Sequence, residues 1–286
     1  MRIIFIGASG MLGKPVVREL INAGHDVSLL ARDPVKLQRL FPNAKLLKGD
    51  VFDKESLLNV FSNADLVYLN LSVHPTSKEK DPQPEREGVQ NIIEAAKEKN
   101  IKRVAYLSSL IKNYEGMNGF RWWAFQIKQK AVDAIKSSGL PHTIFYPSTF
   151  METLPYQMMR GNKIMLLGKS IAPMWFIAAD DYARQVKRSF EIAGGQNKEY
   201  DIQGLEPFTF DEAVKIFIEN YQKEKIKAMK FPIGPIRLFG KFNQQMNYGV
   251  NICEALNRYP EKFESETTWA ELGKPTITLA AFASRL

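Results

Sequence analysis

Short apolar runs alternate with amphipathic stretches along the first half of the chain. Continuous apolar runs bounded by turn residues are typical of parallel strands that helices cover on both faces. The pattern predicts strands at Arg2–Ile6, Asp26–Ala31, Lys45–Lys48, Leu66–Leu71, Arg103–Leu107 and Thr143–Tyr146. It predicts helices at Met11–Ala23, Glu55–Phe61, Arg86–Lys99 and Phe125–Ser138. This alternation indicates βαβ units, and therefore an α/β fold with a doubly wound, mostly parallel sheet.

The regular alternation ends after Pro147. Turn residues and helices predicted at Asp180–Ala193 and Thr209–Asn220 follow, and the segment Phe231–Pro235 interrupts the pattern. We therefore expect one domain over residues 1–150 and a smaller C-terminal lobe over residues 151–286, with segments of the lobe returning to the first domain. No internal repeat or low-complexity tract suggests another division.

The composition is typical of a globular protein. The chain has 286 residues, of which 45% are hydrophobic and 24% charged, and a chain of this length can bury a core without disulfides. A single cysteine, Cys253, excludes an internal disulfide and favours a reducing compartment. No apolar stretch reaches the roughly 18 residues of a membrane span, and the N-terminal apolar run is too short for a signal peptide. We therefore expect a cytoplasmic protein.

The chain carries a net charge of +8. Its lysines are spread along the sequence, with one mild cluster at Lys223, Lys225, Lys227 and Lys230. There is no arginine-rich arm, no stripe of alternating aromatic and basic residues and no zinc-ligand spacing, so nucleic acid is not an expected partner. An excess of positive charge also suits an anionic cofactor or a membrane surface. A solvated, lysine-rich surface is the explanation that we favour.

Three glycines follow the first predicted strand at the spacing GxxGxxG. Gly7 permits a tight turn, Gly10 lets the backbone approach a pyrophosphate closely, and Gly13 lets the following helix pack against the sheet. A helix that begins here directs its free N–H groups at the phosphates. The segment therefore predicts a Rossmann-type fold with a dinucleotide site built from Gly7, Ala8, Ser9, Gly10, Met11, Leu12 and Gly13.

The end of the second predicted strand indicates which dinucleotide binds. An acidic residue there would bond the ribose hydroxyls of NAD, whereas an arginine accommodates the 2′-phosphate of NADP. The residue is Arg32, which Lys36 could assist, and Asp33 is expected to cap the helix that begins at Pro34. We therefore expect NADP rather than NAD, with an unspecific surface role for Arg32 as the alternative.

Further segments repeat the pattern of a known family. They are Ala31–Pro34, Gly49–Asp50, Tyr106–Ser109, Lys128, Ser138–Ile144, Tyr146–Phe150 and Glu271–Pro275. With the glycine segment, they make the sequence resemble the NmrA-like, isoflavone-reductase-like group of atypical short-chain dehydrogenase/reductases. The resemblance spans nearly the whole chain, and it is most specific in the N-terminal third.

The resemblance implies further contacts with the cofactor. Asp50, beside Val51, stands where this superfamily bonds the adenine, although a Gly-Asp pair also suits a plain turn. Two other segments would border the cofactor, the second of them running beside the nicotinamide into the substrate pocket. They comprise Asn70, Leu71 and Ser72 after the fourth strand, and Tyr146, Pro147, Ser148 and Thr149 after the sixth.

The catalytic residues depart from the superfamily pattern. Its enzymes usually carry Tyr-x-x-x-Lys on the helix after the fifth strand, but here Lys128 is preceded by Ala124 in place of the tyrosine. In the isoflavone-reductase-like group a lysine at this place supports catalysis alone. Lys128 could therefore bond the nicotinamide ribose and act as acid and base, with Ser108 or Ser109 polarising the substrate. A solvated helix lysine and strand-end serines that bond backbone are the alternatives.

Aromatic and apolar residues around these positions suggest a substrate pocket. Its expected wall includes Trp122, Trp123, Phe150 and Met151, although ordinary core packing explains any one of them equally well. Tyr114 is a candidate replacement acid. The segment Asp180–Ala183 resembles a structural helix start, at which an aspartate would cap N–H groups.

These features favour an NADP-dependent reductase that acts on a small apolar carbonyl or quinone-like substrate. The alternative is a non-catalytic sensor of the NmrA type that binds NAD(P) and a protein partner, and a third possibility is an assembly factor stabilised by bound NADP. We expect a monomer or homodimer, and no metal site.

Overall fold

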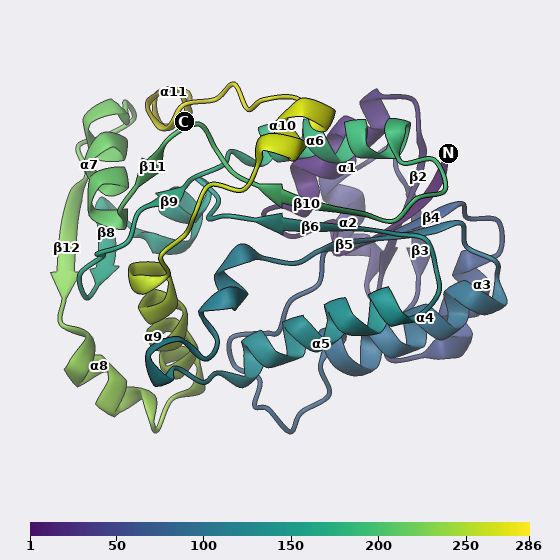
Figure 1. The fold of residues 1–286 in the computed structure, drawn as a ribbon, viewed down its shortest axis with the longest axis horizontal. Coiled ribbons are helices and arrows are strands. Elements are labelled where there is room, and N and C mark those ends of the chain that lie inside the picture. Colours follow the sequence, from purple (N-terminus) through teal and green to yellow (C-terminus); the bar gives the residue numbers. More distant parts are fainter.

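Seven parallel strands form the central sheet of the computed structural model, which describes residues 1–286 (Figure 1). The strands lie in the order β10-β6-β5-β4-β1-β2-β3. Their bounds are β1 Arg2–Ile6, β2 Asp26–Ala31, β3 Lys45–Lys48, β4 Leu66–Leu69, β5 Arg103–Leu107, β6 His142–Pro147 and β10 Lys198–Ile202. The order reverses between β1 and β4, where ligands bind in doubly wound sheets. The expected Rossmann-like α/β fold is confirmed.

Helices cover both faces of the sheet, as Figure 1 shows. On one face lie α1 (Gly13–Asn22), α2 (Pro34–Leu40) and α6 (Ala179–Ile192), which share a core with Ile3 and Phe5 of β1. On the other face lie α3 (Lys54–Phe61), α4 (Val89–Glu98) and α5 (Trp123–Ser137), packed on Ile4 and Ile6. Alternate residues of β1 thus enter opposite cores, which is why the strand is apolar throughout.

Residues beyond β6 build a second group of elements beside the carboxyl edge of this sheet (Figure 1). A three-stranded sheet in the order β12-β8-β7 and a two-stranded pair β11-β9 share a third core with α7 and α11. The strands are β7 Met159–Arg160, β8 Lys163–Leu167, β9 Met174–Trp175, β11 Pro207–Phe208 and β12 Lys227–Phe231. The helices are α7 Phe210–Asn220, α8 Ile233–Gly240, α9 Gln244–Arg258 and α11 Leu279–Ser284, whereas α10 Glu266–Leu272 packs on α6 and β10 of the central sheet. None of the helices combines the length and the apolar character that crossing a bilayer requires.

Four short helical turns connect these elements. They are η1 Pro84–Gly88, η2 Leu110–Tyr114, η3 Met117–Gly119 and η4 Leu154–Met158. The first of them replaces the start of the helix expected at Arg86, so that regular α4 begins only at Val89. It is a π-helical turn, a distortion that occurs often at functional sites.

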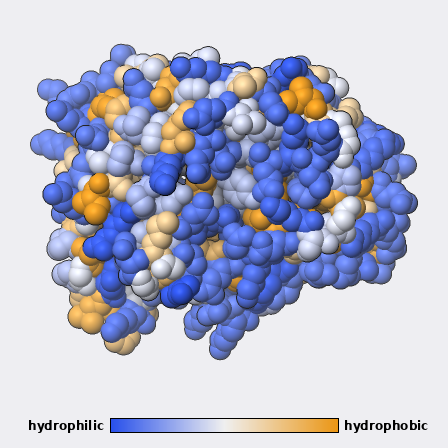
Figure 2. All heavy atoms as spheres, in the orientation of Figure 1, coloured by the Kyte–Doolittle hydropathy of each residue, from blue (hydrophilic) through white to orange (hydrophobic).

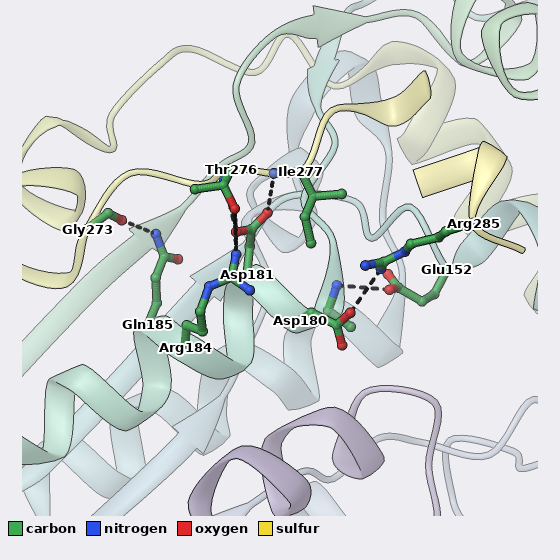
Figure 3. A network of polar contacts seen from close by, with 10 residues as sticks. Glu152, Asp180, Asp181, Arg184, Gln185, Gly273, Thr276, Ile277 and Arg285 are labelled. Carbon is green, nitrogen blue, oxygen red and sulfur yellow. Dashed lines mark hydrogen bonds and ion pairs between the residues drawn. The ribbon is translucent and has the colours of Figure 1, made fainter. Parts of the chain in front are cut away.

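A buried carboxylate holds the C-terminal segment against α6 (Figure 3). Asp181 is 2% exposed and accepts hydrogen bonds from the backbone N–H groups of Thr276 and Ile277, both at 2.9 Å. It also pairs with Arg184. The N–H of Ala179, the first residue of α6, instead donates to Glu152 Oε1 at 3.0 Å. The expectation that an aspartate of this segment caps its own helix is therefore wrong, although the segment is structural.

Candidate functional site

The glycine segment forms a tight turn between β1 and α1. Gly7 has φ +90°, and a Cβ on it would lie 2.1 Å from the carbonyl oxygen of Asn70. A Cβ on Gly13 would lie 2.4 Å from the carbonyl oxygen of Gly7. Both positions therefore require glycine. At Gly13 the start of α1 closely approaches the preceding turn, whereas the sequence led us to expect close packing of the helix against the sheet. The helix begins at Gly13 and not at Met11, because residues 9–12 form the turn.

Asn70 locks this turn from the end of β4. Its Nδ2 donates to the carbonyl oxygen of Gly7 at 3.0 Å, and its backbone N–H continues the sheet by donating to Ile6 at 2.9 Å. The side chain thus holds the loop in shape. Leu71 and Ser72 follow it at the same edge of the sheet, half-buried and exposed respectively.

The start of α1 fits an anionic group. No side chain caps the helix, its first turn has no acidic residue, and Ser9 and Gly10 before it are exposed. Uncapped N–H groups and the helix dipole attract phosphate. A glycine turn that admits no side chain, followed by an uncapped helix, suits the pyrophosphate of a dinucleotide.

Arg32, which directly follows β2, carries a positive charge without an ion pair. The residue is exposed. Asp33 caps α2 by accepting from the N–H of Val35 at 3.2 Å, which confirms the expected cap. Lys36 Nζ lies 4.0 Å from Asp33 Oδ2. The acidic neighbour is therefore engaged with the helix, and the guanidinium remains available to an anion.

The segment after β3 forms a turn at the same edge. Asp50 is half-buried and accepts from the N–H of Phe52 at 3.1 Å, while its own N–H donates to Ser56 Oγ at 3.0 Å. The carbonyl of buried Val51 accepts from Asn91 Nδ2 at 2.9 Å. The alternative of a turn thus describes the backbone here, and contact with an adenine stays a prediction.

Lys128 forms an ion pair with a carboxylate that the sequence did not single out. Its Nζ lies 2.5 Å from Glu85 Oε1, and the hydroxyl of Tyr106 donates to the same oxygen at 2.5 Å. The Glu85 side chain is fully buried, and that of Lys128 is 16% exposed. The alternative of a solvated helix lysine is therefore wrong. Burial, together with the charge of Glu85, raises the pKa of Tyr106 well above its usual range, so the phenol stays protonated.

Glu85 comes to this point from η1, at the start of α4. Its second carboxylate oxygen, Oε2, is buried and has no partner. A carboxylate near a helix N-terminus is favoured by the helix dipole, and the cation of Lys128 compensates its burial. Nothing in the spacing of the sequence indicated Glu85 as the partner of Lys128.

Two serines follow β5, the strand that contains Tyr106. Ser108 is 4% exposed, and its hydroxyl has no hydrogen-bond partner. Its backbone N–H donates to Phe145 at 2.8 Å, which continues the sheet. Ser109 is half-buried at the start of η2. The hydroxyl of Ser108 therefore does not bond backbone, and an unpaired buried hydroxyl is costly unless a ligand or water meets it.

An aromatic cluster adjoins the start of α5. Trp122 is 4% exposed and packs on Phe125 and Tyr248, with ring centroids 4.8 and 5.0 Å apart. The burial of Tyr248, with the charge of Glu85, raises the pKa of its phenol to about 12. Helix α9 of the second group thus brings a tyrosine towards Glu85. Tyr114 lies deeper, fully buried, with its hydroxyl unpaired.

The other expected pocket residues take mixed positions. Trp123 is half-buried, but Phe150 and Met151 are 6% and 2% exposed. Phe150 packs on Tyr182 of α6 at 5.4 Å, and Met151 lies in the core of the second group. Ordinary core packing, the alternative to a pocket wall, is therefore what the structure shows for Phe150 and Met151.

Side chains at the end of β6 are occupied within the protein. Tyr146 donates to Glu199 at 2.7 Å, Ser148 donates to Glu261 at 2.7 Å, and Thr149 contacts the sulfur of Met174 at 3.4 Å. Pro147 is buried between them. The contacts with a cofactor that are expected for this segment stay predictions.

Comparisons with known proteins agree with this geometry. The chain is similar to the Photosystem II assembly factor Ycf39 of Guillardia theta, at 26% identity over 262 residues, which cover 90% of this chain and 81% of that protein. A nucleoside-diphosphate-sugar epimerase from Staphylococcus aureus shares its fold with a TM-score of 0.80 at 20% identity, over 99% of this chain and 100% of its own. The NADPH-dependent quinone oxidoreductase of Escherichia coli, in complex with NADPH, has a TM-score of 0.72 at 19% identity, over 99% of both chains.

The likeness to these solved structures shows the fold alone. A family model described as NAD(P)H-binding matches residues 7–171, more than half of the chain, beginning at the first glycine of the turn after β1. The matched region includes the glycine turn, Arg32, Asp50, Glu85 and Lys128. The chain therefore belongs to the NAD(P)H-binding family.

Proposed function

We propose that the protein is an NADP-dependent reductase of a small apolar carbonyl or quinone-like substrate. The observation that carries the proposal is the ammonium of Lys128, which is held by the buried carboxylate of Glu85. Ser108, which directly follows β5, has a buried hydroxyl without a hydrogen-bond partner. Reduction of a polar double bond uses a proton donor and a group that polarises the substrate oxygen, and Lys128 and Ser108 would supply them.

Arg32 and Lys36 would select NADP through its 2′-phosphate. The backbone of Gly7–Gly13 would hold the pyrophosphate at the start of α1, and Asp50 with Val51 would border the adenine. The unpaired guanidinium of Arg32 after β2, with Asp33 engaged as a helix cap, supports NADP over NAD. The NADPH complex of the Escherichia coli quinone oxidoreductase, which shares the fold, supports the same choice.

Bound NADPH would supply the hydride. The Lys128 ammonium would donate a proton to the substrate oxygen, so that one hydride and one proton complete a two-electron reduction. Glu85 orients that ammonium, and Tyr106 fixes Glu85 by donating to the same oxygen. Ser108 would donate a hydrogen bond to the substrate oxygen and polarise it. Ala124 removes the superfamily's tyrosine from this step, so Lys128 has to provide the proton itself.

Calorimetry with NADPH, NADP, NADH and NAD tests the cofactor. We expect Arg32→Glu to weaken NADPH binding by about tenfold or more and to leave NADH binding almost unchanged, because only NADPH has the 2′-phosphate. Arg39→Glu is the matched control, since Arg39 is also an exposed arginine but lies at the far end of α2. Equal losses in both variants, or no binding of any dinucleotide, would contradict the assignment.

NADPH oxidation with a panel of small quinones and aldehydes tests the chemistry. We expect Lys128→Met to lower kcat by about a hundredfold or more, as the loss of a general acid does. Lys130→Met, two residues further along the same helix and exposed, should leave kcat unchanged. Because Lys128→Met leaves Glu85 buried without its cation, the double variant with Glu85→Gln controls for folding. Full turnover by a folded Lys128→Met protein would exclude the proposed acid.

A second candidate is a dinucleotide-binding assembly factor that acts through a protein partner. The match to Ycf39 over 90% of the chain and the absent tyrosine at Ala124 favour it. The two candidates differ in one measurement. The second candidate predicts that the protein binds NADPH tightly but turns over no substrate in the panel. It also predicts that amide hydrogen exchange in α9 changes when NADP replaces NADPH.

A further inference from the structure

Large apolar side chains are exposed at one corner of the molecule, on α8 and the turn that joins it to α9. Leu238, Phe239 and Phe242 are 58%, 63% and 89% exposed, and Met246 in the first turn of α9 is 37% exposed. Figure 2 shows apolar atoms at the lower left corner, where Figure 1 places α8 and this turn. Exposing several large apolar groups together is unfavourable in water, and such patches mark interaction surfaces.

Positive charge surrounds this corner. Residues 221–242 contain six lysines and arginines and one glutamate, Glu224, so the segment provides most of the net charge of +8. Lys241 is exposed inside the apolar patch and has no ion pair, whereas Arg237 pairs with Glu254. Strand β12 is an edge strand that leads directly into α8 (Figure 1), and of its two lysines Lys230 pairs with Asp211, whereas Lys227 at the start of the strand has no ion pair.

We infer that this corner docks on the surface of an anionic lipid bilayer. Phe239 and Phe242 would enter the boundary between headgroups and acyl chains, with the unpaired Lys241 facing the anionic headgroups. The corner projects from the molecule (Figure 2), and a bilayer accepts a projecting apolar tip without a complementary groove. The docking would be peripheral, and it does not rest on the proposed reductase activity.

Sedimentation with vesicles tests the inference. We expect the protein to bind vesicles of phosphatidylcholine mixed with phosphatidylglycerol, to bind pure phosphatidylcholine vesicles several-fold more weakly, and to be released by salt. The double variant Phe239→Ser, Phe242→Ser should bind mixed vesicles at least about tenfold more weakly, because two large apolar groups no longer leave water. Ile171→Ser is the matched control, since Ile171 is 65% exposed but lies outside the corner.

A charge variant separates the two contributions. Lys241→Glu should weaken binding to mixed vesicles by about fivefold or more and leave binding to pure phosphatidylcholine nearly unchanged. Equal binding of the double variant and the wild type would overturn the inference. So would a concentration-dependent dimer that the double variant abolishes while vesicles stay unbound, because the patch would then join two copies of this chain. A protein that binds neither vesicle type, whatever other protein it captures, would overturn it as well.

Discussion

Glu152 carries a buried carboxyl group beside the start of α6 (Figure 3). Burial raises its pKa to about 7 from an ordinary value of 4.5, although the hydrogen bond from the Ala179 N–H acts in the opposite direction. The folded state therefore binds this proton more tightly than the unfolded chain does. The stability that results is fully present below about pH 4.5, and it is lost as the pH rises through about 7.

The variant Glu152→Gln keeps an oxygen that can accept from Ala179 but cannot ionise. The difference in free energy of unfolding between this variant and the wild type should therefore change with pH. We expect it to shift in favour of the variant by about 2 kcal/mol from about pH 5 to about pH 8. Urea unfolding at the two pH values measures this gain. The neighbouring Asp180→Asn should show no such gain, since Asp180 is half-exposed and paired with Arg285. A difference between Glu152→Gln and wild type that is the same at both pH values would contradict the assignment.

For single residues, the sequence predicts contacts that form within one short segment. The glycine turn and the cap by Asp33 each lie within one short segment, so spacing alone predicts them. Glu85 and Lys128 are 43 residues apart, and Asn70 lies 63 residues from the carbonyl that it bonds. Such partners meet only after the strands and helices have been arranged, and a pattern of spacing does not contain that information. The lysine of the candidate site was therefore predictable, and its carboxylate was not.

Helix α6 is the element that joins the central sheet to the C-terminal segment. Asp181 on this helix accepts two backbone N–H groups, from Thr276 and Ile277, and is almost fully buried. We expect Asp181→Ala to lower the free energy of unfolding by about 2–3 kcal/mol, because it removes the buried acceptor of two part-buried backbone N–H groups and of Arg184. Asp180→Ala removes an exposed ion pair and should cost less than about 1 kcal/mol. Thermal unfolding of both variants makes the comparison, and equal costs would show that Asp181 does not hold the segment.

Elements were predictable where hydrophobic pattern and turn signals coincide. Six strands of the central sheet and their helices were found to within about two or three residues, since helices on both faces make the strands apolar throughout. The seventh strand, β10, was missed. It lies at the edge of the sheet, and its sequence Lys198–Ile202 alternates polar and apolar residues. The pattern also gave little indication of β7, β8 and β9 between residues 159 and 175 and of β12, α8, α10 and α11 beyond residue 226, which are all short. Helix α9, with 15 residues, was missed as well.

The C-terminal segment contacts two of the hydrophobic cores of the molecule. Leu272 of α10 packs in the core between the sheet, α1 and α6, while Leu279 and Phe282 pack in the core of the second group. Glu271 also accepts from Tyr200 at 2.7 Å and pairs with Lys198 at 3.0 Å, which fixes the edge strand β10. The end of the chain therefore connects the sheet to the second group of elements.

A chain that ends after Glu264 should consequently fail to fold. Removing a buried leucine or phenylalanine side chain costs about 2–5 kcal/mol, and three such residues lie in α10 and α11, against a total stability of about 5–15 kcal/mol for a typical protein. A chain that ends after Ser284 loses only the half-exposed Arg285 and the final Leu286, and should unfold within about 1 kcal/mol of the full-length protein. Circular dichroism and thermal unfolding of both truncated chains measure this. Cooperative unfolding of the shorter chain would show that the sheet and the second group hold together without the C-terminal segment, and that α10 and α11 only cover them.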